Sequence, residues 1–124
     1  MLLKGQEFMK KNILNELGKR MVFFDGGMGT LLQERGLEAG ELPENWNLEH
    51  PDIIRELHRD YLNAGADIIL ANTFGANELK FPDNLEEIVT KGVQNAKKAV
   101  EETGKDGYVA LDVGPTGKLL KPLG

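Results

Sequence analysis

The sequence contains no cysteine, so disulfide bonds are excluded as a source of stability. It also lacks a long apolar run, because no stretch approaches the ~20 residues that cross a bilayer. The opening segment MLLKGQEFMK has no apolar core of the kind that a signal peptide needs. These absences predict a cytoplasmic protein with no membrane-spanning segment.

A run of basic residues is missing as well. The chain has 20 acidic and 15 basic residues, which give a formal net charge of -5 and a pI near 5.1. Because no Lys or Arg cluster is long enough to follow a phosphate backbone, nucleic acid is not an expected partner. The length of 124 residues and the hydrophobic content of 40% suit one modest domain.

Segments of helical periodicity alternate along the chain with short apolar runs. The predicted helices cover residues 7–17, 28–36, 51–64 and 83–103. The predicted strands cover residues 21–24, 68–71 and 108–113. Residues 37–50 contain Pro43 and several polar residues, and are predicted to form an irregular loop.

Several residues at the predicted helix ends carry specific signals. Pro51 suits a first helical position, where its missing N–H group would have had no partner. Asp83, followed by Glu86, resembles a capping box. The glycines that are predicted to end helices are Gly18, Gly65 and Gly104.

Short apolar strands linked by helices indicate an α/β fold with a parallel sheet and right-handed crossovers. Each predicted strand ends in a polar group: Asp25 after the first, Asn72 and Thr73 after the second, and Asp112 after the third. Parallel strands bring these ends to one edge, where active sites of such folds form. Asp25 is therefore placed either to meet a substrate or to cap the helix that follows it.

Two glycine-rich segments invite comparison with phosphate-binding loops. Residues 27–32, GMGTLL, have Leu32 where a dinucleotide fingerprint needs its third glycine, and Asp25 would repel a pyrophosphate. Residues 114–119, GPTGKL, have Leu119 where a P-loop needs Ser or Thr. A nucleotide-binding sheet without a fingerprint stays open as an alternative.

The two histidines are not spaced as metal ligands. His50 and His58 lie eight residues apart, so at about 100° per residue their side chains point to different faces of a helix. We interpret His58 as a partly buried or surface residue of its helix. Trp46 is interpreted as a hydrophobic plug over the end of a sheet or barrel.

Three separated motifs resemble one known family. They are DGGMGTLLQERG, PENWNLEHPDIIRELHRDYLNAGADIILANTFGAN and LDVGPTGKLLKPLG. Together they are similar to the homocysteine S-methyltransferase family, and most closely to the N-terminal homocysteine-binding domain of its cobalamin-dependent methionine synthase branch. The resemblance covers nearly the whole chain from residue 21.

The resemblance implies a (β/α)8 barrel in which zinc, held by cysteine thiolates, binds the sulfur of homocysteine. It implies that Asp25 pairs with the amino group of homocysteine, an ionic hydrogen bond. The backbone around Gly26, Gly27 and Gly29 would approach the substrate closely, since no Cβ intervenes. The remaining substrate-binding residues implied at the barrel mouth are Asn72, Thr73, Asp112 and Gly114.

The chain also departs from this family. A (β/α)8 barrel takes ~250 residues, so we expect residues 1–20 to form an N-terminal helix and residues 21–124 to form about three βα units of an incomplete barrel. Without cysteine the chain cannot bind that zinc, whose ligands are expected beyond residue 124. We expect this chain alone to be inactive, and its uncovered third strand to favour self-association.

The methyl donor that the resemblance implies is methylcobalamin with methyltetrahydrofolate, bound by other domains. Three alternatives stay open. One is a betaine- or S-methylmethionine-using relative. The second is a small α/β module that binds a phosphorylated metabolite at residues 26–29, and the third is a non-catalytic assembly fragment.

Overall fold

The computed structural model describes residues 12–122 of the chain. Its elements follow in the order η1 Ile13–Asn15, α2 Gly29–Glu34, η2 Pro43–Asn45, α3 Trp46–Glu49, α4 Pro51–Asn63, β1 Ile68–Leu70, α5 Leu85–Thr103 and β2 Tyr108–Ala110, where η marks a short 3-10 helix. This is a mixed α/β arrangement with a small parallel sheet, as predicted. Within the described residues, no helix is both long and apolar enough to cross a bilayer.

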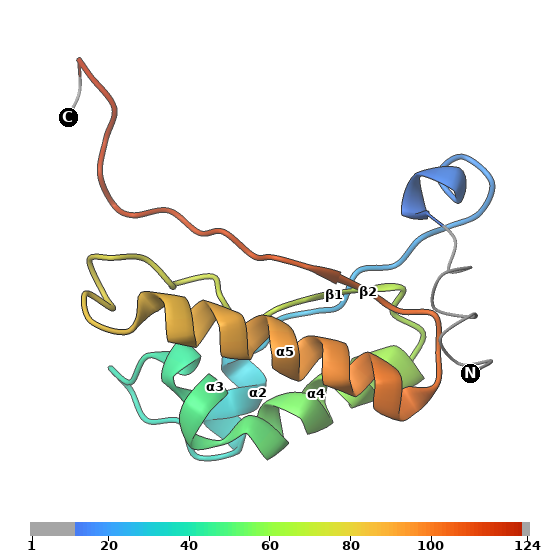
Figure 1. Cartoon of the computed structure of the whole chain (residues 1–124), viewed down its shortest axis with the longest axis horizontal. Coiled ribbons are helices and arrows are strands. Elements are labelled where there is room, and N and C mark those ends of the chain that lie inside the picture. The colour runs from blue at the N-terminus through green and yellow to red at the C-terminus, as the bar shows by residue number, and fades with distance from the viewer. Residues whose placement is uncertain (1–11, 123–124) are drawn as a thin grey trace.

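The sheet joins β1 and β2 in parallel, with Ile68 opposite Tyr108 and Leu70 opposite Ala110. Parallel pairing of consecutive strands needs a crossover, and α5 supplies it. Figure 1 shows that α4 and α5 lie on the same side of the strands. The predicted strands over residues 68–71 and 108–113 are therefore confirmed, each at a shorter length.

The predicted strand over residues 21–24 is wrong as a full strand, because the segment forms a single parallel bridge between Phe24 and Ile68. Asp67 accounts for the difference. Its carboxylate accepts a hydrogen bond from the N–H of Phe23 at 2.9 Å, in place of a backbone partner. The N–H groups of Asp67 and Ile68 both donate to the carbonyl of Phe23. The segment still runs parallel to β1, so the spatial order of the three segments follows the sequence.

Two apolar clusters form the core between the helices and the sheet. The first consists of Leu32, Leu37, Trp46, Ile54 and Leu57. The second joins α4 and α5 to the sheet and consists of Leu62, Ile69, Ala71, Ala96 and Ala99. The prediction of α4 and of its apolar stripe is confirmed. Trp46 lies among the helices of the first cluster rather than over the end of the sheet.

The predicted irregular loop over residues 37–50 is wrong in part, since it contains η2 and α3. Pro43 opens η2, where the fixed φ of proline suits a first helical turn. Trp46 then anchors α3 in the core. The polar composition misled the prediction because Glu44 and Asn47 are buried through hydrogen bonds to distant backbone groups.

The two ends of α5 differ in how well they were predicted. Asn84 precedes the helix, and no side chain caps it, so the predicted capping box of Asp83 and Glu86 is wrong. Glu86 and Glu87 instead lie in the first turn, where carboxylates interact favourably with the helix dipole. Gly104 ends the helix in the left-handed conformation at φ 67°, as predicted.

His58 is fully buried, which corrects its interpretation as a partly buried or surface residue. The reason is that α4 is covered on two sides. The first apolar cluster packs on Ile54 and Leu57, while α5 runs along the helix (Figure 1). Periodicity identifies a single buried stripe and cannot show this second contact.

Most of the predicted N-terminal helix lies outside the described residues, which begin at Asn12. The described part forms η1 rather than an α-helix. The Asn12 side chain accepts a hydrogen bond from the N–H of Leu14 at 2.9 Å and so caps this turn. Gly18 follows with φ 82°.

One face of the sheet is uncovered. The helices from α2 to α5 all lie on the other side of the strands, and the segment after β2 extends away from them (Figure 1). Large apolar side chains of the strand segments stay exposed, among them Phe24 at 61% and Leu111 at 53%. Parallel sheets are normally covered on both faces, so this face is a surface on which further chain can pack.

Candidate functional site

A cleft of about 450 Å³ opens at the carboxyl ends of the strands. Its walls come from the glycine turn after Phe24, from η2, from the end of β1 and the segment that follows it, and from Asp112, two residues after β2. The lining residues are Asp25, Gly26, Gly27, Met28, Gly29, Pro43, Glu44, Leu70, Ala71, Asn72, Thr73, Phe74 and Asp112. The structure thus brings the predicted strand-end residues together at one rim.

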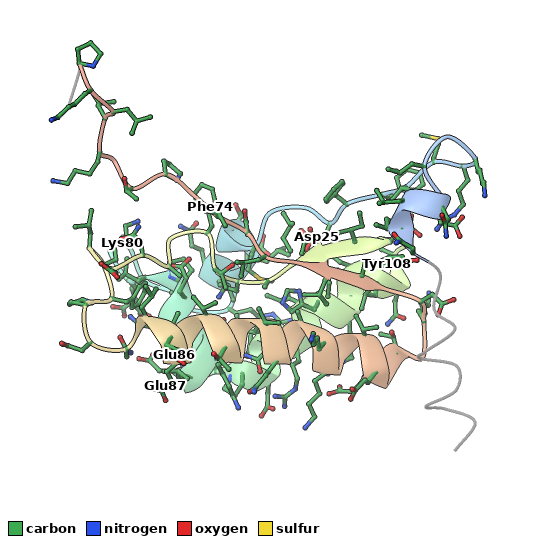
Figure 2. The ribbon with its side chains drawn as sticks, turned by 45° about the horizontal axis from the view of Figure 1, so that its top comes forward. Asp25, Phe74, Lys80, Glu86, Glu87 and Tyr108 are labelled. Carbon is green, nitrogen blue, oxygen red and sulfur yellow. The ribbon has the colours of Figure 1, made fainter. Side chains whose placement is uncertain are left out.

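A wider groove of about 740 Å³ lies at the start of α5. Its walls include Glu86, Glu87 and Lys91, and none of the predicted site residues lines it. Figure 2 shows Glu86 and Glu87 on the side of α5 that faces away from the strands, whereas Asp25 lies at the sheet. The strand-end cleft is therefore the candidate site.

Asp25 is held against β1 by two hydrogen bonds. Its N–H donates to the carbonyl of Ile68 at 3.0 Å, and its Oδ2 accepts from the N–H of Leu70 at 3.1 Å. Its Oδ1 is buried and has no hydrogen-bond partner among the described residues. Burial raises the pKa of Asp25, the Leu70 N–H opposes that rise, and the charge of Asp112 adds to it. The carboxylate therefore has one oxygen, Oδ1, that no donor of the described residues satisfies.

The glycine turn is packed against Tyr61 of α4. The Tyr61 hydroxyl donates to the carbonyl of Gly27 at 2.7 Å. A Cβ on Gly26 would lie 2.8 Å from that hydroxyl oxygen, whereas a Cβ on Gly27 or Gly29 would meet no atom within 4 Å. Gly26 is thus required by the protein's own packing. Gly27 and Gly29 leave open space on the cleft side of the turn.

Asn72 lines the cleft, but its amide group binds other parts of the chain. Its Nδ2 donates to the carbonyl of Pro43 at 2.9 Å and to Oδ1 of Asn47 at 3.0 Å. Asn47 in turn donates to the carbonyls of Asn72 and Ile88. This buried network fixes η2 and α3 beside the strand end, and substrate contact by Asn72 stays a prediction.

Thr73 and Asp112 connect the ends of the two strands. The Thr73 hydroxyl donates to the carbonyl of Asp112 at 2.8 Å and accepts from its N–H at 3.1 Å. Asp112 contributes to the cleft wall. Direct contact of either side chain with a substrate is untested, but their positions at the rim agree with the prediction.

Gly114 is the one predicted site residue that is not part of the cleft wall. Its N–H donates to the carbonyl of Phe74 at 3.0 Å, and a Cβ on it would lie 2.3 Å from that same oxygen. No side chain fits there unless the backbone moves. Gly114 therefore allows the loop after β2 to approach the loop after β1, which positions Phe74 at the mouth of the cleft (Figure 2).

Sequence reasoning missed Glu44. This residue is only 4% exposed, lines the cleft, and accepts a hydrogen bond from the N–H of Gly75 at 3.3 Å. Together with Asp25 and Asp112 it brings three carboxylates to one cleft. The available signal was Pro43, which marks the helical turn that places Glu44, although no local pattern reveals its burial.

The described residues contain no group of three His, Cys, Asp or Glu side chains that could hold a metal ion. His50 is exposed, and its ring lies 4.4 Å from that of Trp46 between centroids. His58 is buried away from any such partners. What the cleft wall offers chemically is three carboxyl groups, those of Asp25, Glu44 and Asp112.

The fold and the site together define a class: a parallel α/β protein with a carboxylate-lined cleft, suited to a small ligand that carries a positive charge. Comparison with known proteins narrows this class. Residues 22–124 match the model of the homocysteine S-methyltransferase family. The chain belongs to this family.

Curated relatives and solved structures agree with the assignment. The chain is 34% identical to methionine synthases of Mycobacterium tuberculosis and Mycobacterium leprae, over alignments that cover 87% of this chain and 10% of each relative. The homocysteine methyltransferase MmuM from Escherichia coli, in its metallated form, matches with a TM-score of 0.69 and 31% identity over 82% of this chain and 40% of that chain. Its oxidized form gives a TM-score of 0.71 and 28% identity, with coverage of 86% and 42%. The chain thus spans about a tenth of the curated relatives and about two fifths of the solved ones.

Proposed function

We propose that this chain forms the first part of a homocysteine-binding (β/α)8 barrel, and that its cleft holds the amino-acid end of homocysteine while the sulfur is methylated to give methionine. The family match and the 40% coverage of a solved relative support this proposal. The parallel order of the strand segments and the uncovered sheet face suit about three βα units of a ~250-residue barrel.

The observation that carries the proposal is the buried, unsatisfied Oδ1 of Asp25, a residue of the cleft wall. A carboxylate with one oxygen bound to Leu70 and the other facing no protein donor can accept a charge-assisted hydrogen bond from the ammonium group of an amino acid. Glu44 and Asp112 add negative charge to the same cleft. These charges favour a cationic group, and they disfavour the alternative of a phosphorylated metabolite at the glycine turn.

Zinc is the group that the family resemblance implies. When bound by thiolates, zinc holds homocysteine sulfur in its thiolate form, which is the nucleophilic form. The residues of this chain do not fit that ion, because the sequence has no cysteine and the described residues hold no metal-ligand cluster. We therefore assign to this chain the binding and orientation of the substrate.

The methyl donor is a further part of the proposal. Likeness to methionine synthases supports methylcobalamin, regenerated from methyltetrahydrofolate, as the donor. We recognise no cobalamin- or folate-binding motif in the 124 residues. A cytoplasmic location is proposed on the same grounds of family likeness.

The test is the affinity of the complete gene product for L-homocysteine, measured by isothermal titration calorimetry. Asp25→Asn is expected to weaken binding by about 1.5–3 kcal/mol, or roughly 10- to 100-fold, because it removes the charge from the acceptor. Asp106→Asn, at an exposed carboxylate in the turn after α5, is the matched control. Metal content is measured in every variant. An Asp25→Asn variant that binds homocysteine as tightly as the control would refute the proposal.

A further inference from the structure

We propose that Tyr61 is a positioning residue for Asp25: its hydroxyl fixes the glycine turn and so holds the carboxylate in the geometry that receives the substrate ammonium group. This inference rests on the proposed function. It extends that function to a residue of α4 which does not line the cleft.

The hydrogen bond from Tyr61 to the carbonyl of Gly27 measures 2.7 Å, the usual length for an O–H···O bond. Among residues 12–122, it is the one hydrogen bond from a side chain to the backbone of residues 26–29. The ring of Tyr61 packs against the second apolar cluster, which contains Leu62 and Ile69, so the core fixes its position. A donor with a fixed position can fix the turn that accepts from it.

The turn is thereby held on two sides. Asp25 is tied to β1 through Ile68 and Leu70, and Gly27, two residues later, is tied to α4 through Tyr61. Between them, Gly26 lies directly against the ring, since a Cβ there would be 3.3 Å from two ring carbons. Loss of the hydroxyl would remove the hydrogen bond of the turn to α4 and leave it held by β1 before Gly26 and by Met28 and α2 after Gly27.

Electrostatics keep the hydroxyl in its donating form. Burial, followed by the negative charge of Asp25, raises the pKa of Tyr61. The hydroxyl is therefore protonated throughout the neutral range.

The test is a double-mutant cycle in the complete gene product, with the dissociation constant of L-homocysteine and the unfolding midpoint as readouts. Tyr61→Phe is expected to weaken binding about fivefold, the loss that follows from one neutral hydrogen bond. In the Asp25→Asn background the same change is expected to cost less than twofold, because the group that Tyr61 positions is already compromised. Tyr108→Phe, at the opposite end of β2 from the cleft, is the matched control and is expected to bind like the wild type (Figure 2).

The possible outcomes separate the two claims. If Asp25→Asn leaves binding unchanged, the proposed function fails and the role of Tyr61 fails with it. If Asp25→Asn weakens binding, but Tyr61→Phe has no effect or has the same effect in both backgrounds, the proposed function stands and the positioning role is overturned. A merely structural role of Tyr61 would give that second pattern, with equal losses in both backgrounds.

A second variant covers the case in which Tyr61→Phe does not fold. Gly26→Ala introduces a Cβ 2.8 Å from the hydroxyl oxygen and so displaces the donor without removing it. Because Gly26 also lines the cleft, Gly27→Ala, which adds a methyl group to the same turn without meeting any protein atom, is the control for obstruction of the cleft. It is expected to weaken homocysteine binding in the Asp25 background and to have little further effect in Asp25→Asn. Equal losses in both backgrounds would again overturn the positioning role.

Discussion

His58 provides a quantitative test of the packing around α4. Its imidazole is fully buried, and neither ring nitrogen has a hydrogen-bond partner among the described residues. Burial lowers the pKa of His58 from 6.5 to about 4. The folded protein therefore keeps this side chain neutral at pH values where the unfolded chain is already protonated.

The direction in which folding stability changes with pH follows from proton linkage. Below pH 6.5 the unfolded state binds more protons at His58 than the folded state, so stability falls as the pH falls from 6.5 toward 4. At 1.36 kcal/mol per pKa unit, the whole shift corresponds to about 3 kcal/mol. About 2 kcal/mol of this is lost at pH 5.

The assay is urea unfolding at pH 7 and pH 5, followed by the fluorescence of Trp46, the single tryptophan, which is buried. His58→Leu removes the titrating group, while His50→Gln changes an exposed histidine and is the matched control. The wild type and the control are expected to lose about 2 kcal/mol more than His58→Leu between the two pH values. Because carboxylates such as Asp25 titrate in all three proteins, their contribution cancels in this difference. Equal losses in the wild type and His58→Leu would refute the argument for a buried, neutral imidazole.

Two further predictions concern the loop after β2 and the uncovered sheet face. Gly114→Ala is expected to destabilise the protein by about 1–3 kcal/mol, since its Cβ would overlap the carbonyl of Phe74. Gly27→Ala, where a Cβ meets no atom within 4 Å, is the control in the same urea unfolding experiment, and equal midpoints would contradict the reasoning. The 124-residue chain on its own is expected to self-associate through its exposed apolar face, so light scattering at micromolar concentration is expected to give a mass above the monomer. A homogeneous monomer would argue against it.

The elements that were predicted well are those whose signals are local. The apolar spacing of α4, with Pro51 at its start, and the glycine at the end of α5 depend only on neighbouring residues. The segment 21–24 has an equally clear strand composition. It fails to form a full strand because a side chain far along the sequence, Asp67, occupies the N–H of Phe23. The residues that neighbour Phe23 in the sequence cannot reveal this hydrogen bond, because its acceptor lies 44 residues away.

The residues of the candidate site also divide into those that a rule on the sequence predicts and those that depend on long-range contacts. A topological rule placed Asp25 and Asp112 at one rim, because the carboxyl ends of parallel strands must meet. Glu44 and Tyr61 could not be found in this way. The burial of Glu44 depends on the N–H of Gly75, which lies 31 residues later in the sequence. The role of Tyr61 depends on the turn that contains Gly27, which lies 34 residues earlier. Both residues acquire their positions only when α4 and η2 pack against the strands.

The hydrogen bonds of Thr73 have a consequence for how this position is interpreted. Its hydroxyl gives and receives hydrogen bonds with the backbone of Asp112, as a peptide group of a neighbouring strand would do. A side chain thus extends the link between the strands to Asp112, two residues after the regular pairing of β1 and β2 has ended at Ala110. Serine could replace it in this task, whereas valine, of almost the same shape, would leave both backbone groups of Asp112 without this partner. The hydroxyl at position 73 is therefore already required by the architecture of the rim, before any ligand enters the cleft.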